Sequence, residues 1–269
     1  MRRAVFLGFR PIDSTGLNLL RRVGATTVIL GLDDEDDDAR GVDPTDYADR
    51  WTVRPQLQGG RAAATLRACR DAGMRVGVHV WGRPVRSWTH AQAAEVRAIH
   101  AAVPLDRVMI DHERHGLRMD PVRGGYGSHA EWVADVARLW TAPPYVGAYP
   151  SWPELWCAIY GLPGVRHAEL VRVCAGAVPM VYGDLKHTGL DPLPLYRRSA
   201  RACAAILRPD QRLVMGVGAY DQSRPGVTAE AMIQRTLGAL RGHDVAIWSL
   251  PHLLHNPGVV RALEVPPCP

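Results

Sequence analysis

Short apolar runs recur along the chain at fairly even spacing, and most are separated by a stretch long enough for a helix. The runs are Val5–Phe9, Thr27–Leu32, Val76–Trp81, Val108–Asp111, Val146–Tyr149, Val178–Tyr182, Leu213–Ala219 and Val245–Trp248. Continuous apolar runs of this length are typical of strands covered on both faces, as in a parallel sheet. The pattern therefore predicts eight strands that alternate with helices.

Eight strand–helix units in 269 residues predict an α/β fold, a single (β/α)8 TIM barrel, because such barrels have about 250 residues. Helix signals support the alternation, with Thr228 as a start signal and Gly73 as a stop. After the fifth run, Ser151 is expected to open a helix that contains Trp156. The chain shows no linker and no internal repeat, so we expect one domain over residues 1–269.

Composition excludes several classes of function. Hydrophobic residues make up 47% of the chain, which is typical of a globular protein, and the net charge of +5 comes from dispersed arginines without a basic block. We therefore expect neither nucleic acid nor a membrane as partner, since no apolar run approaches the ~20 residues of a membrane span. The five cysteines show no Cys-x-x-Cys spacing, and the start of the chain lacks a signal-peptide core. These features predict a protein that is cytoplasmic as synthesised, or one that is delivered with a phage or other assembly.

A pair of carboxylates closes the fourth run. Asp111 and Glu113 are two residues apart, so both side chains should face the barrel axis near its catalytic mouth. Two like charges at short range raise the pKa of one carboxyl, which makes it a usable general acid for glycosidic cleavage. The alternative is a structural role, in which the pair caps a helix or binds Arg114 or Arg118.

The ends of two other runs point the same way. Met180-Val181-Tyr182 closes the sixth run and Trp248 closes the eighth. With these features the chain resembles the family-18 glycoside hydrolases, the chitinase-like barrels, whose fourth strand ends in an Asp-x-x-Asp-x-Asp-x-Glu motif. The first, third and last acidic positions of that motif are matched by Asp106, Asp111 and Glu113.

The match to this family is incomplete. Met109 occupies the second acidic position, and the third strand reads Val78-His79-Val80-Trp81 where the family has a serine- and glycine-rich signature. The chain therefore looks like a distant relative of that family and not like a chitinase proper. Lysozyme-like family-25 barrels also carry Asp-x-Glu at the fourth strand and remain the near alternative.

The resemblance implies a role for each matching residue. Glu113 would be the acid/base, and Asp111 would orient a substrate N-acetyl group or tune the pKa of Glu113. Tyr182 would hydrogen-bond the developing oxazolinium or oxocarbenium, and Trp248 would stack on a sugar face. The implied function is cleavage of an N-acetylated amino-sugar polysaccharide, either peptidoglycan-like or chitin-like, without a cofactor or a metal. The partner would be a carbohydrate polymer.

Other strand-end residues are candidates for the same cleft. The substrate-binding candidates are Tyr149, Trp81, Asp184, Tyr220 and Asp221. An acid at the seventh strand, such as Asp221, would also suit a retaining mechanism in which two carboxylates act and Glu113 is the acid/base. For each aromatic residue, ordinary packing at the barrel rim is the competing interpretation.

Three further hypotheses stay open. The acidic run Asp33–Asp38 is either a Ca²⁺ ligand set or a solvated, substrate-facing loop. His79, His112 and His115 suggest a metal-dependent barrel hydrolase, although their spacing does not supply a convincing zinc ligand set. The loss of an acid at Met109 also fits a carbohydrate-binding or structural barrel without turnover, as a module of a larger assembly such as a phage particle.

Overall fold

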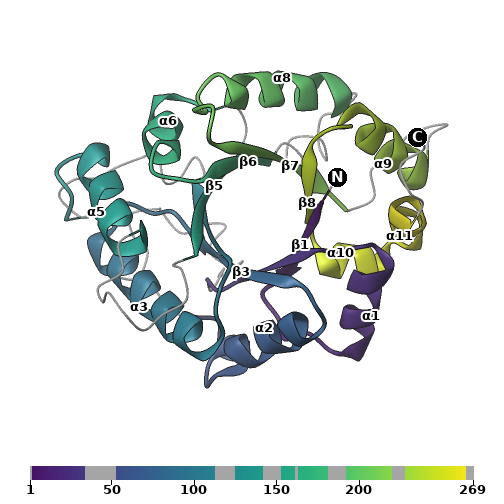
Figure 1. Ribbon diagram of the computed structural model, residues 1–269, viewed down its shortest axis with the longest axis horizontal. Helices are drawn as coiled ribbons and strands as arrows, with labels where there is room; N and C mark the ends of the chain where they lie inside the picture. Colours follow the sequence, from purple (N-terminus) through teal and green to yellow (C-terminus); the bar gives the residue numbers. More distant parts are fainter. Residues whose placement is uncertain are drawn as a thin grey trace, which may run out of the picture.

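Eight parallel strands close into a barrel in sequence order, with β8 pairing to β1 (Figure 1). The computed structural model describes residues 2–33, 53–112, 125–141, 153–160, 163–180, 192–219 and 228–264. The strands are β1 (Arg3–Gly8), β2 (Thr27–Gly31), β3 (Arg75–Trp81), β4 (Arg107–His112), β5 (Glu154–Tyr160), β6 (Gly176–Met180), β7 (Arg212–Gly218) and β8 (Asp244–Trp248). The predicted (β/α)8 TIM barrel is confirmed.

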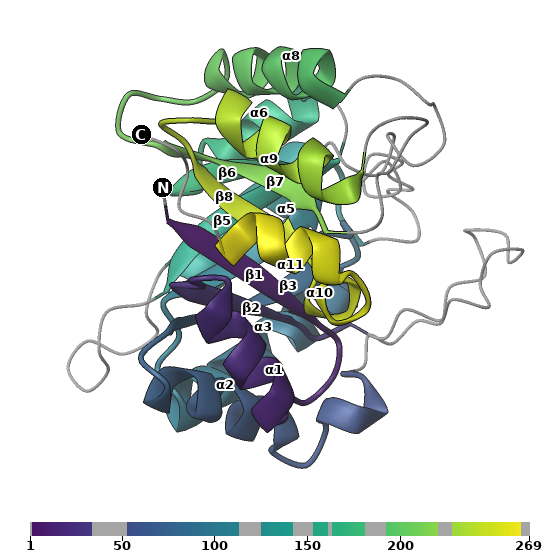
Figure 2. The same ribbon diagram turned by 90° about the vertical axis from the view of Figure 1, so that its right-hand side faces the viewer.

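Helices form the outer layer around the strands (Figure 1). They are α1 (Ser14–Arg22), the short 3-10 helix η2 (Pro55–Leu57), α2 (Arg61–Asp71), α3 (Arg86–Ala102), α5 (His129–Thr141), α6 (Val165–Val171), α8 (Pro192–Ala204), α9 (Ala229–Ala239), α10 (Leu250–His255) and α11 (Pro257–Glu264). Figure 2 shows α10 and α11 beside β1 and β8, and contacts join α10 to β1 and α11 to α9. In the described part of the chain, no helix is long and apolar enough to span a bilayer.

The strands are buried on both faces. Successive side chains point alternately into the barrel and toward the helices. The interior core consists of Ala4, Phe6, Ile29, Met109, Trp156, Ala158, Val178, Met180, Val214 and Ala246. The alternate strand residues, such as Val28, Val108 and Ile159, pack in a larger core between strands and helices. This double burial explains why the strands read as continuous apolar runs.

The fifth strand lies elsewhere than the sequence predicts. Val146–Tyr149 was expected as the strand and Ser151 as the start of a helix, but β5 spans Glu154–Tyr160, so that prediction is wrong. Trp156 pairs in register with Met109 and belongs to the interior core. An apolar run of this length cannot be assigned to strand or helix by periodicity alone, and its aromatic residues suit a strand. Val146–Tyr149 lies outside the described residues.

Other boundaries differ by smaller amounts. The sixth strand begins two residues earlier than expected, at Gly176. The start signal at Thr228 is confirmed, because its hydroxyl accepts a hydrogen bond from the N–H of Ala231 in the first turn of α9. Gly73 follows the end of α2 with a φ of 84°, a value that favours glycine.

Candidate active site at the carboxyl ends of the strands

Strand β4 directs Asp111 into the barrel. Successive residues of β4 face opposite sides of the barrel wall, with Met109 in the interior core and Val108 and Ile110 in the core beneath the helices. Asp111 lies two residues after Met109, so its side chain points into the barrel as well. It is 4% exposed. The expected inward orientation of Asp111 therefore agrees with the structure. Glu113 lies outside the described residues.

Asp111 is hydrogen-bonded to a histidine on the neighbouring strand. The distance from His79 Nε2 to Asp111 Oδ2 is 3.1 Å, and both side chains are almost completely buried. A buried carboxylate needs such a partner, because an ionised group without one is costly to remove from water. The sequence did not predict this pair, although both residues were singled out separately. Register was the missing information, since β3 and β4 must be aligned before His79 and Asp111 can meet.

An aromatic cluster surrounds this pair and includes Trp248. The His79 ring lies 5.6 Å from Phe6 and 6.0 Å from Trp248, measured between centroids and with edge-to-face geometry. Phe6 and Trp248 are 4.8 Å apart, and Phe9 lies 6.4 Å from Trp248. Trp248 is partly buried and packs against the interior core. The barrel thus places Trp248 of β8 next to the histidine that binds Asp111 of β4.

Trp81 ends β3 beside Asp111, with which it pairs in register. The guanidinium of Arg83 lies 4.7 Å from the centroid of the Trp81 ring and 4.9 Å from that of Trp88. This cation–π contact covers part of one face of Trp81. Trp81 is half-buried, so its role as a substrate-binding residue stays a prediction.

Asp33, the first residue of the acidic run, has a structural role. Its carboxylate accepts hydrogen bonds from the backbone N–H of Trp81 at 2.8 Å and from Gln92 Nε2 at 3.0 Å. Asp33 is 1% exposed, so it is neither solvated nor facing a substrate. It joins the end of β2 to β3 and α3 at the mouth of the barrel. The rest of the run, Asp34–Asp38, lies outside the described residues.

Several predicted site residues lie outside the described part of the chain, and their roles stay predictions. They are Glu113, Tyr182, Tyr149, Asp184, Tyr220 and Asp221, together with His115.

A histidine cluster on the outer face of β4 was not predicted. His112 follows Asp111 directly and so faces the opposite side of the barrel wall. It contacts α5, where its Nε2 lies 3.1 Å from His129 Nε2. His129 Nδ1 in turn lies 2.5 Å from the carboxylate of Glu169 on α6. His167 accepts a hydrogen bond from the N–H of Gly164 at Nδ1, so its Nε2–H donates to the His112 carbonyl oxygen, 3.1 Å away. This last bond holds the end of β4 just before Glu113.

Burial dominates the charge state of these histidines. It lowers the pKa of His112 to about 3, and the neighbouring His167 and His129 add to the effect. The pKa of His129 is also lowered by burial, although Glu169 opposes the shift, and burial lowers the pKa of His167. His112 is therefore a neutral imidazole at physiological pH.

The positions of His79 and His112 bear on the metal hypothesis. His79 lies in the barrel interior, whereas His112 packs between the barrel wall and α5. The two imidazoles face opposite sides of the wall and cannot bind one metal ion together. Within the described residues, no group of three or more His, Cys, Asp or Glu side chains is arranged to hold a metal.

Comparisons with known proteins bear on the fold. No family model matches the chain, and no curated protein matches it. Among solved structures, the family-18 chitinase ChiB of Flavobacterium johnsoniae matches with a TM-score of 0.56 and 11% identity, covering 98% of this chain and 92% of that one. A chitinase from Bacteroides thetaiotaomicron matches with a TM-score of 0.55 and 11% identity, covering 98% and 95%.

A protein described as an inhibitor has the same architecture. The xylanase–α-amylase inhibitor protein, solved with trehalose, matches with a TM-score of 0.60 and 9% identity, and 98% of each chain is covered. At such identities the similarity establishes the fold, which agrees with the resemblance to chitinase-like barrels. Function has to be argued from the site, because one fold hosts many activities.

Proposed function

We propose that this protein is a glycoside hydrolase that cleaves an N-acetylated amino-sugar polysaccharide, chitin-like or peptidoglycan-like, with Glu113 as the acid/base. The observation that carries the proposal is the convergence of Asp111 on β4 with Trp248 on β8 through His79, at the carboxyl ends of the strands. Chemistry in this fold is located at that end of the barrel.

Each residue has a defined task in this mechanism. Glu113 protonates the glycosidic oxygen as its bond to the anomeric carbon breaks, and the resulting carboxylate then takes a proton from the water that attacks the anomeric carbon. Asp111 orients the substrate N-acetyl group, whose carbonyl oxygen attacks the anomeric carbon. Tyr182 donates a hydrogen bond to the oxazolinium that forms. Trp248 offers an apolar ring to the C–H face of the sugar. The competing mechanism with an acid at the seventh strand uses Asp221 as the nucleophile.

Met109 occupies a position that is acidic in the chitinase-like motif. Met109 is 2% exposed and packs in the interior core beneath Asp111, so this position supplies no carboxylate. His79 is an ionisable group that contacts Asp111. A histidine partner favours the ionised form of a carboxylate when it is protonated. We therefore expect activity to depend on the state of the His79–Asp111 pair.

Turnover of fluorogenic chitooligosaccharides and of soluble peptidoglycan fragments, measured from pH 4 to 8, tests the proposal. Glu113→Gln should lower kcat by about 10² to 10⁴, the usual contribution of a general acid, and leave the melting temperature unchanged. Glu131→Gln is the matched control, because Glu131 is an exposed carboxylate on α5 that pairs with Arg86. Full activity of folded Glu113→Gln would remove Glu113 from the mechanism.

A carbohydrate-binding protein without turnover is the second candidate, favoured by Met109 at an acidic position. Titration calorimetry with chitooligosaccharides separates the two functions. Binding that Trp248→Ala weakens, with no product formed by the wild type, would support the binding protein. An absence of both binding and turnover for both sugar classes would contradict both candidates.

A further inference from the structure

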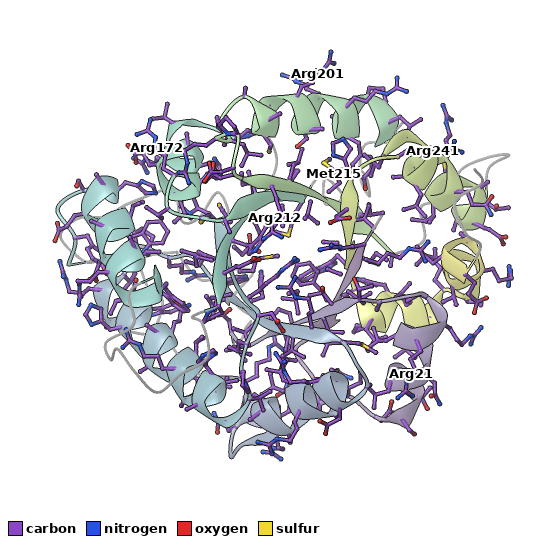
Figure 3. The ribbon with its side chains drawn as sticks, viewed as in Figure 1. Arg21, Arg172, Arg201, Arg212, Met215 and Arg241 are labelled. Atoms are coloured by element: carbon purple, nitrogen blue, oxygen red, sulfur yellow. The ribbon has the colours of Figure 1, made fainter. Side chains whose placement is uncertain are left out.

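Three arginines meet at the end of the barrel opposite to Asp111. Arg75 and Arg212 are the first residues of β3 and β7, and Arg107 is the first residue of β4. The guanidiniums of Arg107 and Arg212 lie 4.8 and 4.9 Å from the centroid of the Trp156 ring, which belongs to the interior core. Viewed down the barrel, Arg212 lies inside the ring of strands, whereas Arg201 lies on the outer helix layer (Figure 3).

Arg107 is the unusual member of this arginine cluster, which consists of Arg75, Arg107 and Arg212. Its side chain is 9% exposed, and its Nε lies 3.6 Å from Glu154 Oε2, too far for a hydrogen bond. Nε is fully enclosed without a hydrogen-bond partner. Within the described residues, none of the hydrogen bonds involves its guanidinium, although this group carries five donors. Such a buried cation is costly unless it has a hydrogen-bonding partner.

The carboxylates nearby are engaged by other groups. Glu154 Oε2 accepts hydrogen bonds from Arg212 Nη2 at 2.5 Å and from Trp156 Nε1 at 3.2 Å. Asp106 Oδ2 accepts from Arg70 Nη2 at 2.7 Å and from the backbone N–H of β3, at Val76. Asp106 Oδ1 also accepts from Arg75 Nε at 3.4 Å. Glu154 therefore attracts Arg107 by charge at 3.6 Å, but neither acid accepts a hydrogen bond from it.

Positive charge is in excess around Arg107. The charged groups that act on it are Arg75, Arg212, Glu154 and Asp106, and Asp106 is also paired with Arg70. Four guanidiniums thus face two carboxylates. Burial lowers the pKa of Arg107, and its two arginine neighbours lower it further. Of these four guanidiniums, Arg70, Arg75 and Arg212 each pair with Asp106 or Glu154. Arg107 is the one whose Nε has no hydrogen-bond acceptor among the described residues.

We propose that the arginine cluster binds a tetrahedral oxyanion, of which inorganic phosphate is the simplest. Guanidiniums are planar forks whose N–H pairs match the oxygens of a phosphate group, and such charge-assisted bonds are among the strong ones. An anion here would accept hydrogen bonds from the terminal Nη groups of Arg107, since its Nε is enclosed, and would offset the excess charge. Arg75 and Arg212 are 40% and 44% exposed, so the site is open to an ion from solvent. The site is distinct from the proposed sugar-cleaving end and does not depend on it.

Titration calorimetry with inorganic phosphate against the full-length protein, at ionic strength held constant with sodium chloride, tests this inference. We expect saturable binding of one phosphate per chain, and competition by sulfate. Arg212→Gln should raise the Kd for phosphate at least tenfold, because it removes a charged fork while the half-exposed position tolerates the change. Arg201→Gln is the matched control and should bind as the wild type does, since Arg201 is exposed on α8.

Each other outcome counts against the site. The absence of saturable binding above the chloride background would overturn the inference. Equal weakening by Arg212→Gln and Arg201→Gln would mean that general positive charge, not the cluster, attracts the ion. Binding of acetate without binding of phosphate would overturn the assignment to a tetrahedral oxyanion. Far-ultraviolet circular dichroism of both variants verifies that each is folded.

Discussion

Acid should destabilise this protein at pH values well above those that protonate carboxylates, and His112 is the main reason. Its ordinary pKa is 6.5, and burial beneath α5 lowers the folded-state pKa to about 3. Between these two values the unfolded chain binds a proton that the folded chain excludes. Stability is therefore fully present above pH 6.5 and is lost as the pH falls toward 3.

The magnitude follows from the size of the shift. Each pH unit between the two pKa values corresponds to about 1.4 kcal/mol, so His112 alone should lower the free energy of unfolding by roughly 2 kcal/mol between pH 7 and pH 5. His129 and His167 act in the same direction, since their pKa values are also lowered by burial. Glu169 opposes the shift at His129, and the positive charge of Arg166 adds to it.

Urea denaturation followed by tryptophan fluorescence at pH 7, 6 and 5 measures this loss. His112→Phe keeps a ring of similar shape without a titratable group, so its stability should fall less steeply over that range, even though it starts lower at pH 7. His255→Gln, at an exposed position of α10, should retain the wild-type slope. If the wild type is equally stable at pH 7 and 5, or if His112→Phe keeps the wild-type slope, the reasoning is refuted.

Substitutions at three further positions test local contacts of the barrel. Gly176→Ala should destabilise the barrel by about 1–3 kcal/mol or more, because its Cβ would lie 2.2 Å from the backbone oxygen of Arg212; a melting temperature equal to that of the wild type would contradict this contact. Asp33→Ala should cost about 1–3 kcal/mol in urea denaturation, since the N–H of Trp81 loses its acceptor, and an unchanged midpoint would argue against the structural role. Thr228→Ala should cost about 1 kcal/mol through loss of the α9 cap, whereas Thr228→Ser should retain most of the stability by the same assay.

Much of the barrel could be predicted from the sequence because a strand that is buried on both faces reads as a continuous apolar run. Seven of the expected strands overlap the observed ones, and each reads as an apolar run. The fifth strand failed because the segment around Trp156 is apolar at nearly every position, which suits a buried helix as well as a buried strand. The distinction came from pairing, since Trp156 lies in register with Met109 across β4 and β5.

In the candidate site, too, the sequence predicts features set within one strand but not contacts between strands. Alternation along one strand is local, so the sequence by itself was enough to predict that Asp111 faces the interior. Contacts between strands depend on register and closure, which no local pattern carries. Only the tertiary structure decided that His79 binds Asp111, that Trp248 joins them across the closed barrel, and that Arg107 is buried beside Arg212.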